Sequence, residues 1–225
     1  MIIKENWFYK LSDLNDTNIV IDKWVIASFF DNWNNKVNVT LLENSRVDFF
    51  WYYKNSWDFW INFLQESDNS ILKVKYLLTS KEEKKLTSKI YSKISSDKSS
   101  SDVKIISIVS DNWNIDLDWI IEIDKWIKKV SAHLTEDNLF LWDNWKVKWV
   151  PTLLVRSDDV EASHACKIER ISDDKLFYLR SRWIWKDNAL NLILEANIKS
   201  IFSCISMLDD EFYQNLYKEI LNEIN

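Results

Sequence analysis

Short runs that alternate apolar and polar residues fill the chain from about residue 18 to residue 175. Three clear runs are Lys36–Leu42, Val103–Val109 and Ile120–Asp124, and all are rich in β-branched side chains. A period of two with β-branched residues predicts strands that are buried on one face. The runs follow one another closely, so we expect a sandwich, a barrel or a β-helix. No hexapeptide repeat is visible, which disfavours a left-handed helix of the acyltransferase type.

A polar stretch interrupts this pattern between residues 80 and 102. Its serine- and lysine-rich composition is typical of a linker, which is one interpretation. Apolar residues at Leu86, Ile90 and Ile94 break the polarity at intervals that suit strands. We therefore predict edge strands here, joined by a loop over residues 95–101.

The period changes to three and four residues after about residue 186. Asp187 is positioned to cap a helix, and an apolar stripe follows it. The acidic residues Asp209, Asp210 and Glu211 suit the N-terminus of a second helix. We predict two amphipathic helices, whose apolar faces either pack on each other or dock on a partner. The stripes consist of Leu190, Ile193, Leu194, Ile198, Ile201, Phe202 and Ile205 in the first helix, and of Phe212, Leu216, Tyr217, Ile220 and Ile224 in the second.

Composition and charge narrow the class of protein. With 225 residues, 47% of them hydrophobic and 28% charged, the chain suits one globular domain or one domain with an appendage. A formal net charge of −6 argues against nucleic acid as the main partner. No apolar run is long enough for a membrane-spanning helix and Met1–Asn6 has no signal-peptide core, so we expect no membrane partner. Two cysteines do not make a disulfide framework, so we expect a cytoplasmic protein.

The chain contains no glycine and 14 tryptophans. About 7% of an ordinary chain is glycine, so roughly sixteen would be expected here. The tripeptide Asp-Asn-Trp occurs three times, ending at Trp33, Trp113 and Trp145, where Asn-Gly would be a strong turn signal. We hypothesise that tryptophan stands where the organism places glycine, because it reads UGA as glycine, and we expect many of the tryptophans at exposed bends. The alternative is a genuinely tryptophan-rich protein with aromatic platforms for sugars or bases.

One segment carries the best candidate chemistry. The chain shows no P-loop, no G-x-S-x-G motif and no zinc-ligand spacing, even with glycine restored at each tryptophan. His164 and Cys166 are separated by a single residue, so in a strand they share a face and could bind iron or zinc. The alternative is a half-buried histidine beside a small core cysteine. For His133 a structural role is the preferred interpretation.

Three segments of the chain carry motifs of a known protein family. Pro151–Val155 followed by Asp158–His164 resembles the signature P-x-L-x-I…DDV-x-A-S-H. Leu176–Ile184 resembles LFYLRSRGI, with Trp183 where the family has glycine. Ser131–Leu141 resembles the strand that leads to the family's LLL end. With these motifs the chain resembles the SufB/SufD family of iron–sulfur cluster assembly proteins. The resemblance covers a little under half of the chain, and its motifs are specific.

The resemblance implies a mainly β fold, a right-handed parallel β-helix followed by a short C-terminal helical domain. On this basis we divide the chain into an N-terminal segment (1–17), a β-helix core (18–180) and a C-terminal helical domain (181–225). It also implies a scaffold subunit, not an enzyme in itself, that holds an iron–sulfur cluster transiently and no permanently bound cofactor. The implied partners are a SufB-like subunit, paired through the β-helix, and a SufC-like ATPase, held by the C-terminal helices.

Site residues follow from the same resemblance. It implies that His164 is a cluster ligand, and so an iron ligand, at the interface with the SufB-like subunit. Cys166 is a second candidate, at a position where the family signature S-H-G-A-T has no cysteine. SufB-type members have a cysteine at the position that Trp145 occupies ahead of Pro151, so the chain is SufD-like. The candidates for partner contacts are Arg182, Leu190, Leu194, Ile198, Phe212 and Leu216.

Two other classes of function stay open at this point. One is a β-helix protein that binds or acts on carbohydrate, with clustered tryptophans and paired carboxylates in a groove. The other is a non-catalytic structural paralogue, which stabilises a partner without touching the cluster.

Overall fold

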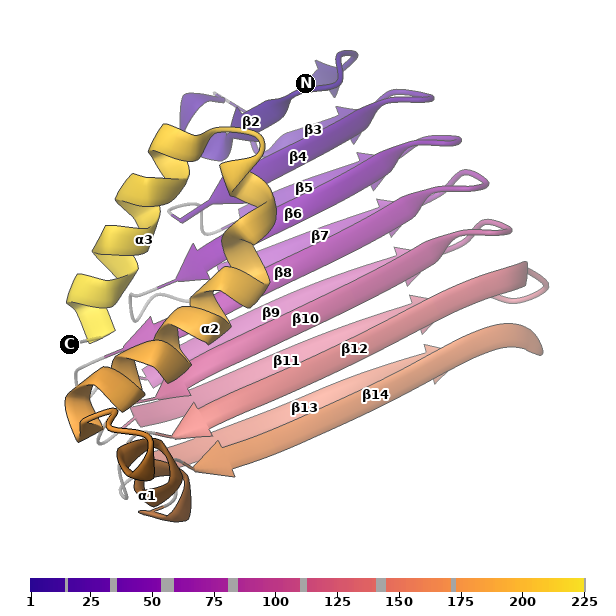
Figure 1. Ribbon diagram of the computed structural model, residues 1–225. Coiled ribbons are helices and arrows are strands. Elements are labelled where there is room, and N and C mark those ends of the chain that lie inside the picture. The colour runs from indigo at the N-terminus through magenta and orange to yellow at the C-terminus, as the bar shows by residue number, and fades with distance from the viewer. Residues whose placement is uncertain are drawn as a thin grey trace.

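The computed structural model describes residues 1–14, 16–32, 36–53, 59–80, 85–109, 113–140, 145–170 and 173–224. These residues form a parallel β-helix followed by three α-helices (Figure 1). Odd-numbered strands make one seven-stranded sheet, sheet A, and even-numbered strands make the other, sheet B. The mainly β class, with a β-helix and a short C-terminal helical part, is confirmed.

The bounds of the elements follow the chain through the two sheets. Sheet A contains β1 (Ile2–Ile3), β3 (Asn18–Ile21), β5 (Lys36–Leu41), β7 (Phe59–Gln65), β9 (Lys85–Ile94), β11 (Trp113–Ile123) and β13 (Trp145–Val155). Sheet B contains β2 (Phe8–Lys10), β4 (Ile26–Asp31), β6 (Arg46–Tyr53), β8 (Ile71–Ser80), β10 (Ser100–Val109), β12 (Lys128–Phe140) and β14 (Asp159–Arg170). A short 3₁₀ helix covers Leu11–Asp13, and the α-helices are α1 (Asp173–Ser181), α2 (Lys186–Ser206) and α3 (Asp210–Ile224).

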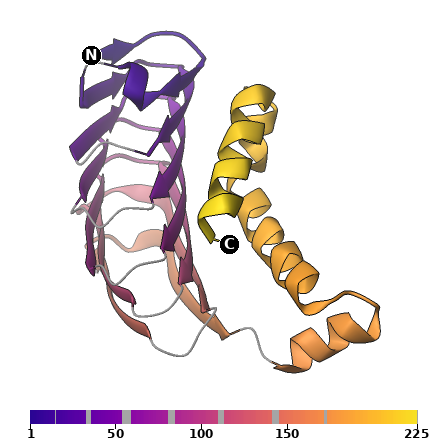
Figure 2. The same ribbon diagram turned by 90° about the vertical axis from the view of Figure 1, so that its left-hand side faces the viewer.

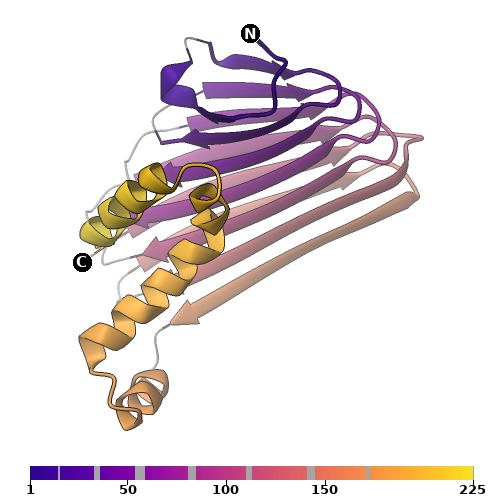
Figure 3. The same ribbon diagram turned by 45° about the horizontal axis from the view of Figure 1, so that its top comes forward.

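The coils lengthen from the N-terminal end of the solenoid to its C-terminal end. In sheet A, Asn18 pairs with Asn38 near the start of the solenoid, whereas Trp113 pairs with the more distant Trp145 near its end. The strands lengthen in the same direction (Figure 3). Because the spacing changes from coil to coil, the chain shows no fixed sequence repeat, and side-chain alternation is the main signal that the sequence carries.

Alternation fills the space between the two sheets with apolar side chains. In β5, buried residues alternate with exposed or half-buried ones. Aromatic rings also stack from coil to coil, with Tyr9 5.4 Å from Phe29 and Phe29 6.1 Å from Phe49 between ring centroids. Each large side chain buried in this way contributes roughly 1.5–3 kcal/mol to folding. The three strands predicted from alternation correspond to β5, β10 and β11, so the prediction is confirmed.

The lysine-rich strand β9 is not an edge strand, so the prediction for residues 80–102 is wrong on this point. It pairs with β7 on one side and with β11 on the other. Its polarity comes from alternation, because Ile90 and Ile94 are buried between the sheets while Lys89 is exposed. The loop that follows is also shorter than predicted, since β10 already begins at Ser100.

One corner of the solenoid has a left-handed backbone in coil after coil. At the passage from sheet A to sheet B, the residues Trp24, Asn44, Asn69, Lys98 and Trp126 have φ between 56° and 68°. Glycine adopts this region freely and asparagine tolerates it, whereas other side chains cost roughly 1–2 kcal/mol. Two tryptophans therefore stand at a stacked corner that favours glycine or asparagine.

Trp183 occupies another left-handed position, directly after α1, with φ of 64°. Its N–H donates to the carbonyl of Arg180 at 2.9 Å, and the N–H of Ile184 donates to that of Leu179 at 3.1 Å. This pair of bonds is the Schellman arrangement, whose left-handed residue is usually glycine. Trp183 is also the tryptophan that replaces glycine in the family motif.

The other tryptophans divide into exposed and buried ones. Two are buried between the sheets, Trp51 and Trp119, and their indole N–H groups have no hydrogen-bond partner among the described residues. Those with exposed side chains are Trp7, Trp24, Trp60, Trp126, Trp183 and Trp185. Trp33, Trp57 and Trp142 lie outside the described residues, as do the side chains of Trp113, Trp145 and Trp149. The left-handed bends at Trp24, Trp126 and Trp183 suit the recoding hypothesis, whereas the buried Trp51 and Trp119 do not lie at exposed bends, and the hypothesis stays a prediction.

The helices α2 and α3 pack on the outer face of sheet B and form a second apolar core there (Figure 2). The outer face contributes Phe30, Phe50, Tyr52, Leu77, Ile106, Ile108 and Leu139. The helices contribute Leu194, Ile198, Ile201, Phe202, Ile205, Tyr213, Leu216 and Ile220. The predicted apolar stripes thus pack on each other, as one of the two alternatives expected, and also on the chain's own sheet, which neither alternative included.

The helix termini differ in how they are capped. The N-cap of α2 is Trp185, without a side-chain hydrogen bond, so the prediction of Asp187 as the cap is wrong. Asp209 caps α3, because its Oδ1 accepts a hydrogen bond from the N–H of Phe212 at 2.9 Å. Lys10 of β2 donates to the other oxygen at 3.1 Å. The Phe212 N–H and the Lys10 ammonium together hold the pKa of Asp209 below its usual range.

Candidate functional site

The candidate site lies on β14, at the C-terminal end of the solenoid. β14 is the last strand of sheet B and pairs along one edge with β12. Cross-strand register places His164 beside Leu134 and Cys166 beside Glu136. Leu134 and Glu136 are buried between the sheets. His164 and Cys166 therefore share the inner face of the last coil, which confirms that the two side chains lie on one face of a strand.

A buried carboxylate lies beneath the histidine. Nε2 of His164 is 3.7 Å from Oε2 of Glu136, a distance that suits an ion pair but not a hydrogen bond. Glu136 is only 2% exposed, and its Oε2 has no hydrogen-bond partner among the described residues. Burial raises the pKa of the Glu136 carboxyl, while the His164 imidazole opposes that rise. The pair puts a basic nitrogen and a carboxylate oxygen at the mouth of the solenoid.

Cys166 adds a sulfur on the same face as His164. Nδ2 of Asn138 donates to its sulfur at 3.8 Å and to the carbonyl of Lys167 at 3.4 Å. Asn138 is almost fully buried, and its Oδ1 has no partner among the described residues. Burial, and then the nearby Glu136 carboxylate, raises the pKa of the Cys166 thiol. Imidazole nitrogen, carboxylate oxygen and sulfur are ligands that suit iron and zinc.

His133 faces the opposite side of the same sheet. Its Nδ1 is 2.7 Å from Oγ of Ser163, which lies beside it across the strands. Ser163 and His164 are neighbours in a strand, so their side chains point to opposite faces. His133 therefore takes no part in the inner-face group, in agreement with the structural role expected for it.

Exposed apolar residues lie on β13 and β14, the last strand of each sheet. Ile168 follows Cys166 on the inner face of β14 and is 58% exposed. Further exposed apolar residues lie on the facing strand β13: Val150, Leu153, Leu154 and Val155. Alternation points Leu153 and Val155 toward the inner face and Val150 and Leu154 toward the outer face, so exposed apolar side chains border the end of the solenoid on both faces.

The candidates for partner contacts lie in two different places. Arg182 is exposed beside α1, where its guanidinium lies 5.4 Å from the ring centroid of Tyr178. The other candidates lie in the second core: Leu194, Ile198 and Leu216 are buried there, and Leu190 and Phe212 pack against it. A partner could reach the three buried side chains only if the helices left sheet B, whereas Leu190 and Phe212 are half-buried, and the role of all five in a partner contact stays a prediction.

Sequence reasoning missed Glu136 and Asn138. Each lies beside a residue of the next coil, Glu136 beside Cys166 and Asn138 beside Ile168. A polar residue at an inward-facing position of an alternating strand was the available signal. It could be used only once the coil length was known, because the coil length decides which inward residues become neighbours.

Three further findings concern the possible chemistry of the chain. No group of three or more His, Cys, Asp or Glu side chains in the described part of the chain is arranged to hold a metal ion. No helix among the described residues is long and apolar enough to cross a membrane. Both cysteines, Cys166 and Cys204, are free thiols.

The fold and the site define a class: a parallel β-helix protein with helices packed on one face and potential metal donors at its open end. Residues 35–197 match the family model described as "SUF system FeS cluster assembly, SufBD core domain". Because the match covers more than half of the chain, the chain belongs to the SufB/SufD family of iron–sulfur cluster assembly proteins.

Individual relatives agree with this family. The iron–sulfur cluster assembly protein SufD of Escherichia coli (strain K12) is 33% identical over 90 residues, which are 40% of this chain and 21% of that protein. A SufBD family protein of Pyrococcus horikoshii is 32% identical over 78 residues, 35% of this chain and 18% of that protein. One of Mycobacterium leprae is 37% identical over 71 residues, 31% of this chain and 18% of that protein. The chain thus spans about a fifth of the curated relatives that it matches.

Proposed function

We propose that this chain is a SufD-like scaffold subunit, which pairs with a SufB-like subunit and helps to build an iron–sulfur cluster without being an enzyme itself. The observation that carries the proposal is the position of His164 and Cys166, on the inner face of the open end of a SufB/SufD-family solenoid. The similarity to SufD of Escherichia coli supports the SufD-like assignment. The free cysteines suit a reducing compartment, so we place the protein in the cytoplasm.

The cluster is the cargo of this site and no permanent cofactor is proposed. His164 offers an imidazole nitrogen to iron, and Cys166 offers sulfur on the same face. Clusters of this kind are commonly held by four protein ligands. We therefore expect the partner subunit to supply the remaining ligands, which requires the site to lie at an interface.

The open end is suited to such an interface. β14 has one edge paired with β12, and no strand lies along its other edge among the described residues. An unpaired edge offers backbone hydrogen bonds to another chain. Together with the exposed Ile168 and the apolar residues of β13, this edge is where we expect the SufB-like subunit to pair.

The ATPase contact is assigned to the helical part, and within it to α1. Phe177 is 71% exposed, and Tyr178 and Arg182 are exposed beside it. Figure 2 shows α1 away from the second core, at the end of the molecule that carries β14. Aromatic and arginine side chains are typical anchors of protein interfaces. A SufC-like ATPase could bind α1 without moving α2 or α3.

The substitution His164→Ala tests the cluster role. We expect clearly less iron and acid-labile sulfide in the complex after anaerobic co-expression with SufB-like and SufC-like partners, because an iron donor is lost. Far-UV circular dichroism should be unchanged, since the side chain lies at an open end.

The matched control is His133→Ala, on the opposite face of the sheet, which should keep the wild-type iron and sulfide content. A wild-type cluster yield in His164→Ala, with the complex intact, would contradict the proposed ligand role. It would favour the non-catalytic structural paralogue instead.

The double substitution Phe177→Ala/Tyr178→Ala tests the ATPase contact. We expect affinity for the SufC-like ATPase to fall at least about tenfold in a pull-down or titration, as for loss of an interface anchor. Leu192→Ala, at an exposed position of α2, is the control. Unchanged binding by the double variant would move the contact away from α1.

The carbohydrate alternative gains no support from the arrangement of the tryptophans. Such a function would need exposed tryptophans gathered with paired carboxylates in a groove. Trp183 and Trp185 line one pocket beside α1, but no carboxylate is among the described residues that line it, and Trp24 is at a corner near the N-terminal end.

A further inference from the structure

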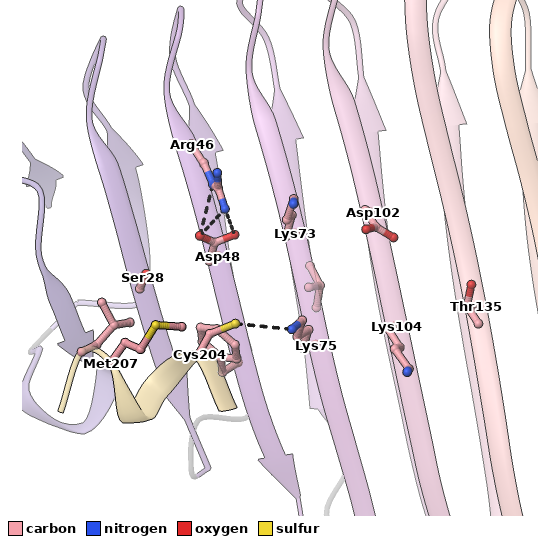
Figure 4. A pocket seen from close by; sticks show the side chains of 13 residues that line it. Ser28, Arg46, Asp48, Lys73, Lys75, Asp102, Lys104, Thr135, Cys204 and Met207 are labelled. Carbon is pink, nitrogen blue, oxygen red and sulfur yellow. Dashed lines mark hydrogen bonds and ion pairs between the residues drawn. The ribbon is translucent and has the colours of Figure 1, made fainter. Parts of the chain in front are cut away.

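A groove of about 600 Å³ lies between the outer face of sheet B and the C-terminal end of α2 (Figure 4). It is separated from the open end of the solenoid, because its floor is formed mainly by β6, β8 and β10. Cross-strand register puts Asp48, Lys73 and Asp102 side by side in one row of this floor. Opposite charges alternate along this row, which is a stabilising arrangement.

The next row along the strands on this face differs in its charge pattern. Phe50, Lys75 and Lys104 lie side by side there. Neighbouring strands are only about 4.8 Å apart, and like charges directly opposite each other are destabilising. The second row thus concentrates positive charge beside an aromatic ring.

Ion pairs neutralise only some of the cations in the groove. Arg46 binds Asp48 at 3.0 Å, and Lys104 is 3.8 Å from Asp137. Four basic and two acidic side chains line the groove in total, in a chain whose net charge is −6: Arg46, Lys73, Lys75, Lys104, Asp48 and Asp102. The groove is therefore positive within a negative protein.

Two lysines of the groove lie outside these ion pairs, although Lys73 has Asp48 and Asp102 as neighbours in its row. Neither the Lys73 nor the Lys75 ammonium forms an ion pair with a carboxylate among the described residues. The sulfur partner of Lys75 is Cys204, whose Sγ accepts from Nζ at 3.7 Å (Figure 4). A thiol is a weak acceptor and does not neutralise an ammonium group.

The opposite wall of the groove is apolar. Met207, 82% exposed, and Leu208 follow α2 and line the groove opposite the floor, to which the ring of Phe50 belongs. No tryptophan is among the described residues that line the groove, so its shape does not depend on the recoding hypothesis.

From these observations we propose that the groove binds a small amphiphilic anion. Lys73 and Lys75 bind its acidic head group, and Phe50, Met207 and Leu208 contact its apolar or aromatic body. Charge-assisted hydrogen bonds from two lysines give orientation, and burial of the body against the apolar wall adds affinity. The site is independent of the proposed cluster role, since none of the open-end residues described above lines it.

The test compares two fluorescent probes with the same ring system, 8-anilinonaphthalene-1-sulfonate and its uncharged analogue N-phenyl-1-naphthylamine. The variant is Lys73→Gln/Lys75→Gln, and the matched control, Lys36→Gln/Lys89→Gln, removes two charges from sheet A. We expect the sulfonate probe to bind the groove variant at least about tenfold more weakly, and the uncharged probe to bind both variants equally. Equal binding of the sulfonate probe to wild type and groove variant, or an equal loss in the control, would overturn the proposal.

A second measurement uses the wild-type protein alone. Saturating sulfonate probe should slow alkylation of Cys204 by iodoacetamide, because the thiol lines the groove, and should leave the rate at Cys166 unchanged. Peptide mass spectrometry reads the two sites separately. Alkylation of Cys204 at the same rate with and without the probe would place the probe elsewhere and reject the site.

Discussion

Sheet B carries two polar surfaces, one on each face, and their chemistry is opposite. On the inner face at the open end, His164 and Cys166 lie beside the buried carboxylate of Glu136. On the outer face at the centre, Lys73 and Lys75 lie beside an apolar wall. Each surface includes a cysteine, but Cys166 has a carboxylate as its charged neighbour and Cys204 has an ammonium group.

This difference shows how one solenoid can serve two kinds of ligand. Successive side chains of a strand point to opposite faces, so the residue types on one face can differ independently of those on the other. The inner face offers nitrogen, oxygen and sulfur donors that suit a metal cation, whereas the cationic outer face suits an anion. Only the outer face needs the helices, because α2 supplies the second wall of the groove.

The largest expected effect tests this dependence on α2. Phe202 is buried in the second core, 6.2 Å from Phe30 between ring centroids. Phe202→Ala should lower the free energy of unfolding by roughly 3–5 kcal/mol, through lost burial and a cavity. Urea denaturation followed by circular dichroism measures it. The exposed Phe177→Ala is the control and should change stability by less than about 0.5 kcal/mol.

If the groove depends on α2, Phe202→Ala should also weaken binding of the sulfonate probe, because the wall that α2 forms is no longer held in place. A variant that loses several kcal/mol but binds the probe normally would show that the groove does not depend on the docked helix.

A smaller effect separates the two surfaces directly. His164→Ala should reduce the iron and sulfide content of the complex without changing binding of the sulfonate probe. Lys73→Gln/Lys75→Gln should lower the affinity for the sulfonate probe about tenfold without changing the cluster yield. Measuring both quantities on both variants gives a crossed design. Any variant that changes both would mean that the two faces are coupled through the sheet.

The smallest effect concerns a residue that belongs to neither surface. Trp183→Gly should raise the free energy of unfolding by roughly 1 kcal/mol, because glycine adopts the left-handed conformation without a Cβ clash. Trp60→Gly is the control, because Trp60 lies in a strand, where glycine is unfavourable. Probe binding should stay unchanged in both. A loss of stability in Trp183→Gly would count against glycine as the natural residue, as would native peptides that contain tryptophan at position 183.

Much of the fold could be predicted because the side-chain period is local. Alternation indicated the strands, and the change of period marked the helices. The coil length could not be read in the same way, since it grows along sheet A from the coil that pairs Asn18 with Asn38 to the coil that pairs Trp113 with Trp145. For that reason the β-helix was inferred from a family resemblance, and the inner strand β9 was mistaken for an edge.

The site was predicted in part for the same reason. The spacing of His164 and Cys166 placed both on one face, but their neighbours Glu136 and Asn138 come from the preceding coil of sheet B. An amphipathic stripe such as that of α2 indicates only that a face is buried, and it does not identify the surface that covers it.

The contact between α3 and the first coils also constrains the order of events during synthesis. Lys10 reaches Asp209 across 199 positions, and the ring of Phe8 lies 5.9 Å from that of Phe212. The narrow N-terminal coils leave the ribosome first, yet this part of their packing cannot form until residues near 212 have been translated. Contacts between such distant positions close a large loop and form slowly. The outer face of β2 and β4 must therefore stay uncovered for most of translation. During that time this apolar surface is exposed to association with other chains.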